Sequence, residues 1–235
     1  MAQKKLLRFA QIKEFDNVFE KPTDMQGKWR AHFKNENPLI LELACGRGEY
    51  TIGLAQLHSN KNFVGVDIKG NRMYIGAKRA MDNKLDNAAF LRSQIESLSY
   101  CFFTDEVDEI WITFPDPQLR ISKAKKRLTH PRFLREYQQI LKKGGSIHLK
   151  TDSPNLYRFT KKVIAMYGLS LLEDSADVYS ASVIAPELKI KTHYESLDIA
   201  GSKKIHYLKF CLATSLADHD DALQKNLVEE NDIQA

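Results

Sequence analysis

Short apolar runs alternate with longer amphipathic segments along most of this chain. The runs have the length of β-strands, and the segments between them carry apolar residues at helical spacing, two of them with proline in the first turn. The runs span residues 39–43, 63–66, 88–91, 109–113, 146–151 and 206–213, and the helical segments span 49–57, 71–81, 131–141 and 154–167. This alternation predicts an α/β fold in which helices cover both faces of a mainly parallel sheet.

The rest of the chain sets the expected domain limits. With 235 residues the chain can bury one sizeable core and is short for two. We expect a charged, helical or irregular extension at residues 1–34, one domain at 35–215 and a tail at 216–235. The tail is strongly acidic, with Lys225 as its one lysine or arginine, and we expect it to be disordered apart from a short helix.

Composition restricts the setting in which the protein works. No apolar run has the length of a bilayer crossing, and the N-terminus lacks the apolar core of a signal peptide, so we expect a soluble, cytoplasmic protein. Cys45, Cys101 and Cys211 lie far apart, and the histidines lack the spacing of metal ligands, so neither a disulfide framework nor a metal site is expected. No feature indicates a protein partner. The net charge of +5, which the acidic tail reduces, suits a phosphate-binding surface.

A glycine turn follows the first predicted strand. In the sequence Leu-Glu-Leu-Ala-Cys-Gly-Arg-Gly-Glu at 41–49, the strand leads through Gly46 and Gly48 into a helix, which allows the backbone to approach a ligand closely. Asp67 ends the next strand, where a carboxylate can accept hydrogen bonds from both ribose hydroxyls. A lone Gly-x-Gly is weak evidence for a cofactor site, but the turn and Asp67 together predict a site for a nucleoside cofactor.

The glycine spacing separates two classes of enzyme that bind such cofactors. A dinucleotide oxidoreductase would place a third glycine at position 51, where this chain has Thr51. The stretch from Glu42 to Gly48 instead resembles the Glu-x-Gly-x-Gly-x-Gly pattern of class I methyltransferases, which bind S-adenosylmethionine, with Ala44 at the first glycine. This resemblance implies a Rossmann-like class I methyltransferase fold with a mostly parallel, seven-stranded sheet.

A single acid, Asp116, stands between two prolines directly after the strand at 109–113. The prolines restrict the direction in which the acid points, and a run of cations follows at Arg120 and 123–127. Taken separately, the acid could be only a turn cap and the cations only a solvated face. Together they favour chemistry on a nucleic acid, because cations beside a reactive group suit a phosphate backbone.

Four motifs narrow the class to one family. Phe-Pro-Asp-Pro at 114–117, Lys-Arg-Leu-Thr-His-Pro-Arg-Phe-Leu at 126–134, Lys-Thr-Asp at 150–152 and Thr-His-Tyr-Glu at 192–195 resemble the tRNA (guanine-N7)-methyltransferase family of the bacterial TrmB type in order and spacing. The similarity covers about residues 37–213. It implies methyl transfer from S-adenosylmethionine to N7 of a guanine in the variable loop of tRNA. The chain departs from the family at 116–123, where a tryptophan and a second proline are missing.

The resemblance also implies roles for individual residues. The expected cofactor-binding residues, including the two glycines of the turn, are Glu42, Gly46, Gly48, Asp67, Gln94 and Asp116. Asp116 is also the expected catalytic residue. The expected substrate-binding set is Arg120, Asp152, Thr192, His193, Tyr194 and Glu195. The residues expected on the RNA backbone are Lys123, Lys125, Lys126 and Arg127.

The chemistry of guanine N7 indicates what the acids would do. N7 carries an in-plane lone pair and no proton, so methyl transfer needs alignment more than a strong base. Asp116 or Asp152 could hold the guanine N1–H and amino group and favour the positive charge that develops on the purine. A plainer role for Asp152 is to cap the helix that follows it. Two functional alternatives stay open: methylation of another RNA base or a small molecule, and an inactive relative that binds RNA.

Overall fold

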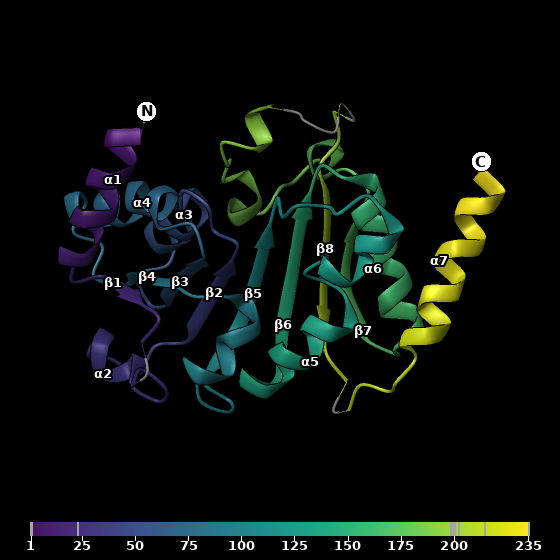
Figure 1. The fold of residues 1–235 in the computed structure, drawn as a ribbon, viewed down its shortest axis with the longest axis horizontal. Helices are drawn as coiled ribbons and strands as arrows, with labels where there is room; N and C mark the ends of the chain where they lie inside the picture. Colours follow the sequence, from purple (N-terminus) through teal and green to yellow (C-terminus); the bar gives the residue numbers. More distant parts are fainter. Residues whose placement is uncertain (1, 23, 198–200, 202, 214, 235) are drawn as a thin grey trace.

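One mixed sheet forms the centre of the protein. The computed structural model describes residues 2–22, 24–197, 201, 203–213 and 215–234. Within them, eight strands pair in the order β1-β4-β3-β2-β5-β6-β8-β7 (Figure 1). The strands are β1 Val18–Glu20, β2 Leu39–Leu43, β3 Asn62–Asp67, β4 Ala88–Arg92, β5 Val107–Thr113, β6 Leu141–Thr151, β7 Ser170–Ser175 and β8 His206–Cys211. Pairing is parallel from β1 to β6, and β8 runs antiparallel to both β6 and β7.

Helices cover both faces of this sheet, which confirms the predicted fold class. The α-helices are α1 Ala2–Gln11, α2 Trp29–Phe33, α3 Glu49–Leu57, α4 Gly70–Asp82, α5 Pro131–Ile140, α6 Pro154–Met166 and α7 Asp220–Gln234. Short 3-10 helices are η1 Ile12–Glu14, η2 Ile95–Tyr100, η3 Ile121–Lys126, η4 Val178–Ser180, η5 Pro186–Lys189 and η6 Glu195–Leu197. The apolar residues of α3 and α4 form one core, and those of α2, α5 and α6 form the other. Alternate strand residues enter the two cores, as the period of a β-strand requires.

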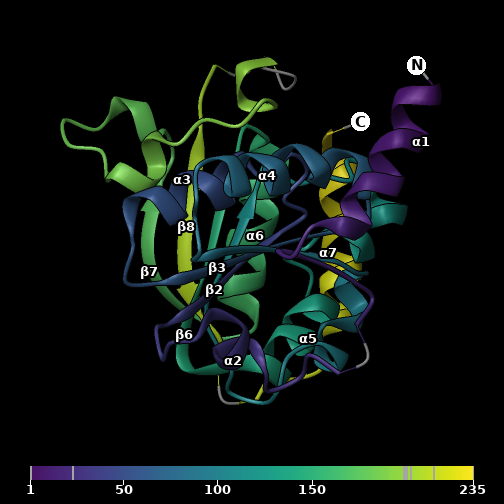
Figure 2. The ribbon, with the colours of Figure 1, turned by 90° about the vertical axis from the view of Figure 1, so that its left-hand side faces the viewer.

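The sheet has one strand more than the seven expected. The extra strand, β1, comes from the N-terminal extension and pairs with β4, with Val18 opposite Phe90. The ring of Phe19 packs edge-on against Trp29, with 5.1 Å between ring centres. With three residues β1 is too short for an apolar alternation to reveal it in the sequence. Figure 2 shows α1, from the same extension, beside α4.

The acidic tail, for which we expect disorder apart from a short helix, is helical over most of its length, because residues 220–234 form α7. Its first turn is fixed by Asp220, whose carboxylate accepts hydrogen bonds from Arg135 at 2.9 and 3.0 Å and from the Tyr167 hydroxyl at 2.6 Å. Leu223 is buried, with 1% of its surface exposed. Acids in the first turn also favour a helix through its dipole. These contacts join α7 to α5 and the end of α6 along one side of the molecule (Figure 1).

Within the described ranges, none of the helices is both long enough and apolar enough to cross a bilayer.

Candidate active site

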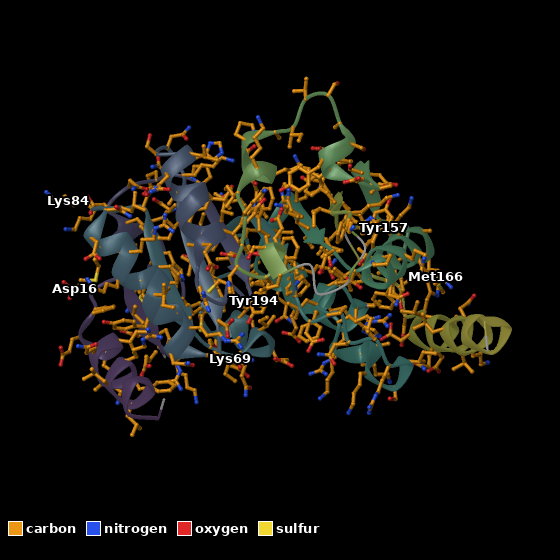
Figure 3. All side chains as sticks on the ribbon, turned by 90° about the horizontal axis from the view of Figure 1, so that it is seen from above. Asp16, Lys69, Lys84, Tyr157, Met166 and Tyr194 are labelled. Atoms are coloured by element: carbon orange, nitrogen blue, oxygen red, sulfur yellow. The ribbon has the colours of Figure 1, made fainter. Side chains whose placement is uncertain are left out.

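A cavity of about 750 Å³ opens at the carboxyl ends of the central parallel strands. Open α/β sheets bind ligands at this end of their strands. Figure 3 looks down on it and places Lys69 and Tyr194, two of its lining residues, near the middle of the molecule. The other lining residues are Ala44, Gly46, Asp67, Ile68, Arg72, Phe114, Pro115, Asp116, Pro117, Leu119, Asp152, Ser153, Pro154 and Asn155.

The turn after β2 is built around two glycines and an acid. Gly46 and Gly48 have φ of 57° and 70°, in the left-handed region that favours glycine. A Cβ atom on Gly48 would lie 2.5 Å from the ring of Phe90, so no larger residue fits. Asp67 accepts a hydrogen bond from the Gly46 amide at 2.9 Å and another from the Lys69 amide at 2.8 Å. Each carboxylate oxygen has a second lone pair, so Asp67 can still accept hydrogen bonds from a ligand in the cavity.

Glu42 lies behind this turn rather than in the cavity wall. Its side chain accepts hydrogen bonds from the Thr51 amide at 2.7 Å, from the Thr51 hydroxyl, and from the Thr113 hydroxyl at 2.7 Å. Burial raises the pKa of this carboxyl group to about 7, although the hydrogen bonds from the threonines act in the opposite direction. In this geometry Glu42 ties the start of α3 to the end of β5, and it is not among the residues that line the cavity.

Asp116 lies in a tightly turned segment at the end of β5. Phe114 and Gln118 on either side of it have φ of 47° and 46°, which non-glycine residues adopt rarely. Asp116 is exposed, lines the cavity, and accepts a hydrogen bond from the Gln118 amide at 3.0 Å. The other oxygen of the same carboxylate can accept a hydrogen bond from a ligand in the cavity.

Asp152 follows β6 and lines the same cavity. The plainer role considered for it, capping the next helix, is wrong. Ser153 is the residue that caps α6, because its hydroxyl accepts a hydrogen bond from the Leu156 amide at 3.2 Å. Strands β5 and β6 are neighbours, so their ends bring Asp116 and Asp152 to one cavity.

The basic segment after Asp116 divides into two parts. Lys123, Lys125 and Lys126 are exposed on η3, and Arg120, also exposed, lines a shallow hollow beside the cavity together with Lys123. The prediction that Arg127 binds the RNA backbone is wrong, because only 5% of its surface is exposed.

Arg127 instead holds the Asp116 turn from below. Its guanidinium donates hydrogen bonds to the Pro117 and Gln118 carbonyls at 3.1 to 3.3 Å and lies 4.4 Å from the centre of the Phe159 ring. A cation engaged in this way supports the loop that carries Asp116 and is not presented to a phosphate.

The segment at 192–195 contributes one residue to the cavity, Tyr194. Thr192 is buried, and its hydroxyl accepts a hydrogen bond from the Glu195 amide at 3.1 Å. His193 is half-buried beside Tyr194 and does not line the cavity. The Glu195 carboxylate pairs with the buried Lys150 at 2.9 Å. Gln94 is exposed just beyond β4, also outside the cavity wall.

The structure adds two cations to the cavity that the sequence reasoning did not single out, Lys69 and Arg72. Arg72 donates a hydrogen bond to the Tyr194 hydroxyl, and its guanidinium lies 5.6 Å from the centre of that ring. Lys69 precedes α4 and Arg72 lies in its first turn. Their closeness in sequence to Asp67, the expected ribose-binding acid, is the signal that could have revealed them.

The fold and this site define a Rossmann-like methyltransferase. The 16S rRNA methyltransferase KamB superposes with a TM-score of 0.62 over 84% of this chain and 99% of its own, at 15% identity. A 30S ribosomal A1408 methyltransferase from an uncultured bacterium gives 0.59 over 82% and 96%, at 18% identity. A family model described as "Putative methyltransferase" matches residues 36–208.

Sequence relatives narrow the class. The chain is 43% identical to the tRNA (guanine-N(7)-)-methyltransferase of Christiangramia forsetii, over 89% of this chain and 98% of that protein. It is 43% identical to the enzyme of the same name from Bacteroides fragilis, over 90% and 87%, and 31% identical to that of Bacillus subtilis, over 77% and 83%. The chain therefore belongs to the tRNA (guanine-N7)-methyltransferase family, as the sequence motifs predicted.

Proposed function

We propose that this protein transfers a methyl group from S-adenosylmethionine to N7 of a guanine in tRNA. One observation carries the proposal: the Gly46 turn, Asp67, Asp116 and Asp152 line a single cavity with exposed lysines beside it, in a chain of this family. We further propose that residues 35–215 are the methyltransferase domain, to which the extension adds β1.

The cavity fits S-adenosylmethionine in size and in chemistry. A volume of about 750 Å³ lies within the range of pockets that hold molecules of this size. Asp67 would accept hydrogen bonds from the ribose hydroxyls, and the Gly46 turn would lie against the nucleoside. Gln94, just beyond β4 and outside the cavity wall, stays a proposed contact of the cofactor. The bound cofactor supplies an electrophilic methyl group on a sulfonium centre.

The acids at the other side of the cavity would orient the base. Guanine presents N1–H and the amino group as donors on one edge, and Asp116 and Asp152 are acceptors at the ends of adjacent strands. Holding that edge fixes the direction of the N7 lone pair, and a nearby carboxylate favours the positive charge that the purine gains on methylation. Asp116 is the proposed catalytic residue in this sense, as a group that contacts the base rather than one that removes a proton.

The exposed cations would hold the RNA. Lys123, Lys125 and Lys126 on η3, with Arg120 at the adjoining hollow, lie directly after the Asp116 turn, so a phosphate backbone bound there passes the mouth of the cavity. Of the segment 192–195, Tyr194 would contact ligand, and Thr192 and Glu195 would act by shaping the turn.

Methyl transfer from labelled S-adenosylmethionine to unmodified bulk tRNA tests the proposal. We expect incorporation by the wild type and a loss of at least about 100-fold in Asp116→Ala, the size of effect seen when one stabilising group of an active site is removed. Asp86→Ala, which changes an exposed acid away from the cavity, is the matched control. Absence of labelled tRNA, with binding of S-adenosylhomocysteine intact by calorimetry, would point to another substrate or to an RNA-binding protein.

A further inference from the structure

Residues 176–197, which follow β7, lie across the end of the sheet where the cavity opens. We call residues 176–197 the strap; it contains η4, η5 and η6 and appears in green at the top of Figure 1. On α3, the Tyr50 hydroxyl donates a hydrogen bond to the Glu187 carbonyl at 2.5 Å, and His58 Nε2 lies 2.8 Å from the Glu187 carboxylate. The strap therefore packs on α3 at its middle and carries Tyr194 into the cavity wall near its C-terminal end.

A fully buried lysine fastens the strap to the sheet. Lys150, next to the last residue of β6, has 0% of its surface exposed. Its ammonium group donates hydrogen bonds to the Leu188 carbonyl at 2.9 Å, the Ile190 carbonyl at 2.8 Å and the Glu195 carboxylate at 2.9 Å. These three acceptors, all in the strap, use the three protons that an ammonium group has.

Glu195 is correspondingly withdrawn from the cavity. Its side chain is 5% exposed, one oxygen pairs with Lys150, and the other accepts a hydrogen bond from the Tyr179 hydroxyl. A carboxylate that is buried to this extent and does not line the cavity is poorly placed to receive a substrate. A buried charge without its partner is costly, so the two side chains hold each other in place.

The neighbour of Glu195 is the residue that faces the ligand site. Tyr194 takes a hydrogen bond from Arg72, and its ring edge lies 3.9 Å from the point where a Cβ atom on Gly46 would be. Tyr194 thus covers the glycine turn on the side proposed for the cofactor. Its position depends on the turn that Thr192 and Glu195 form.

We infer that Lys150 is a positioning residue, which acts through Glu195 to hold Tyr194 over the Gly46 turn, and that Glu195 is an anchor of the strap and not a substrate ligand. The same lysine joins the strap to the Asp116 turn, because its backbone carbonyl accepts a hydrogen bond from the Phe114 amide at 2.8 Å. The inference rests on the proposed function for the identity of the cofactor.

A mutant cycle on the Lys150–Glu195 pair tests the inference, with ligand affinity as the first readout and hydrogen exchange as the second. The variants are Lys150→Met, Glu195→Gln and the double variant, and calorimetry measures the dissociation constant of S-adenosylhomocysteine. We expect each single variant to bind about tenfold more weakly, and the double variant to lie within about threefold of the weaker single, because coupled neighbours are not additive. tRNA affinity without cofactor should change less than about threefold in all three, since no direct contact is lost.

Hydrogen exchange in the absence of ligand is the second readout. Both single variants should speed exchange of amides at 186–197 and leave those of the central strands β2 and β3 unchanged, because only the strap is released. Lys161→Met is the matched control: it breaks a surface pair with Asp174, at 2.6 Å, and should change neither readout.

Three outcomes would overturn the inference. They are unchanged exchange in the strap, additive losses in the cycle, or a loss of tRNA affinity in Glu195→Gln that Lys150→Met does not share. If Lys150→Met does not fold, Tyr194→Ala replaces it: adding Glu195→Gln to that variant should cost no further cofactor affinity, and a further tenfold loss would contradict the inference. A wild type that binds no S-adenosylhomocysteine would overturn the proposed function, and the exchange measurement would still decide the role of Lys150.

Discussion

Glu42 illustrates, at the scale of single residues, how a charged group can serve a site that it does not line. The sequence resemblance placed it among cofactor ligands, and the structure places it behind the glycine turn, where Thr51 and Thr113 surround its carboxylate. A glutamate there fixes where α3 begins relative to β5. These contacts of Glu42 with Thr51 and Thr113 also fix the position of the Gly46 turn, so Glu42 supports the site without lining the cavity.

Replacing Glu42 with glutamine should change how stability depends on pH. Burial raises the pKa of Glu42 from 4.5 to about 7, so between these values the folded protein binds more protons than the unfolded chain, and its stability falls as pH rises. Glu42→Gln removes this loss, and the variant should gain about 3 kcal/mol on the wild type between pH 4.5 and pH 7.5. Urea unfolding of both proteins across that range measures the difference. Glu36→Gln, at an exposed acid, is the control, and a pH-independent difference for Glu42→Gln would refute the role assigned to burial.

At the scale of elements, the basic segment after β5 combines two functions that its sequence does not separate. The lysines of η3 are exposed, and Arg127 at its end is enclosed by the Pro117 and Gln118 carbonyls and the Phe159 ring. Phe159 belongs to α6, more than thirty positions away in the chain, so no local pattern could reveal that contact. One part of the segment is available to a phosphate backbone, and the other holds the Asp116 turn.

The salt dependence of tRNA binding should separate these two functions. Replacing Lys123, Lys125 and Lys126 with alanine should reduce the slope of log affinity against log salt by about 2 to 3, because each lost phosphate contact removes about 0.7 to 0.9. Arg127→Ala should leave that slope unchanged and lower the methylation rate, because it loosens the turn that carries Asp116. Filter binding at several salt concentrations provides the slopes. Equal slopes for the triple variant and the wild type would contradict the placement of RNA over η3.

Helix α7 packs on the body of the protein through Leu223 and Asp220. Leu223→Ala should lower the free energy of unfolding by about 2 to 4 kcal/mol, the cost of truncating a buried leucine. Val228→Ala, on an exposed part of the same helix, should change it by less than about 0.5 kcal/mol. Urea unfolding compares the two variants. Similar values for both would mean that α7 does not pack on the body of the protein.

At the scale of the whole molecule, the central fold could be predicted from the sequence because the features that indicate it are local in the chain. The five parallel strands β2 to β6 are apolar runs. Asp67 is the last residue of its strand, and Gly46, Asp116 and Asp152 lie just beyond theirs, so parallel pairing brings them to one edge. The remaining features depend on distant contacts. The Lys150–Glu195 pair joins residues 45 positions apart, and the docking of α7 needs Arg135 and Tyr167. A charge pattern along the chain cannot specify such partners.

Nucleotide analogues offer the most direct test of methylation at N7. Two transcripts of one tRNA would be compared with labelled S-adenosylmethionine, one containing guanine and the other 7-deazaguanine, in which a carbon replaces N7. The lone pair proposed as nucleophile is absent from the analogue, whereas the edge that Asp116 and Asp152 would hold is unchanged. We predict incorporation into the guanine transcript, mapped by cleavage at N7-methylguanine, and none into the analogue. Equal incorporation into both transcripts would contradict the assignment of N7 as the methylated atom.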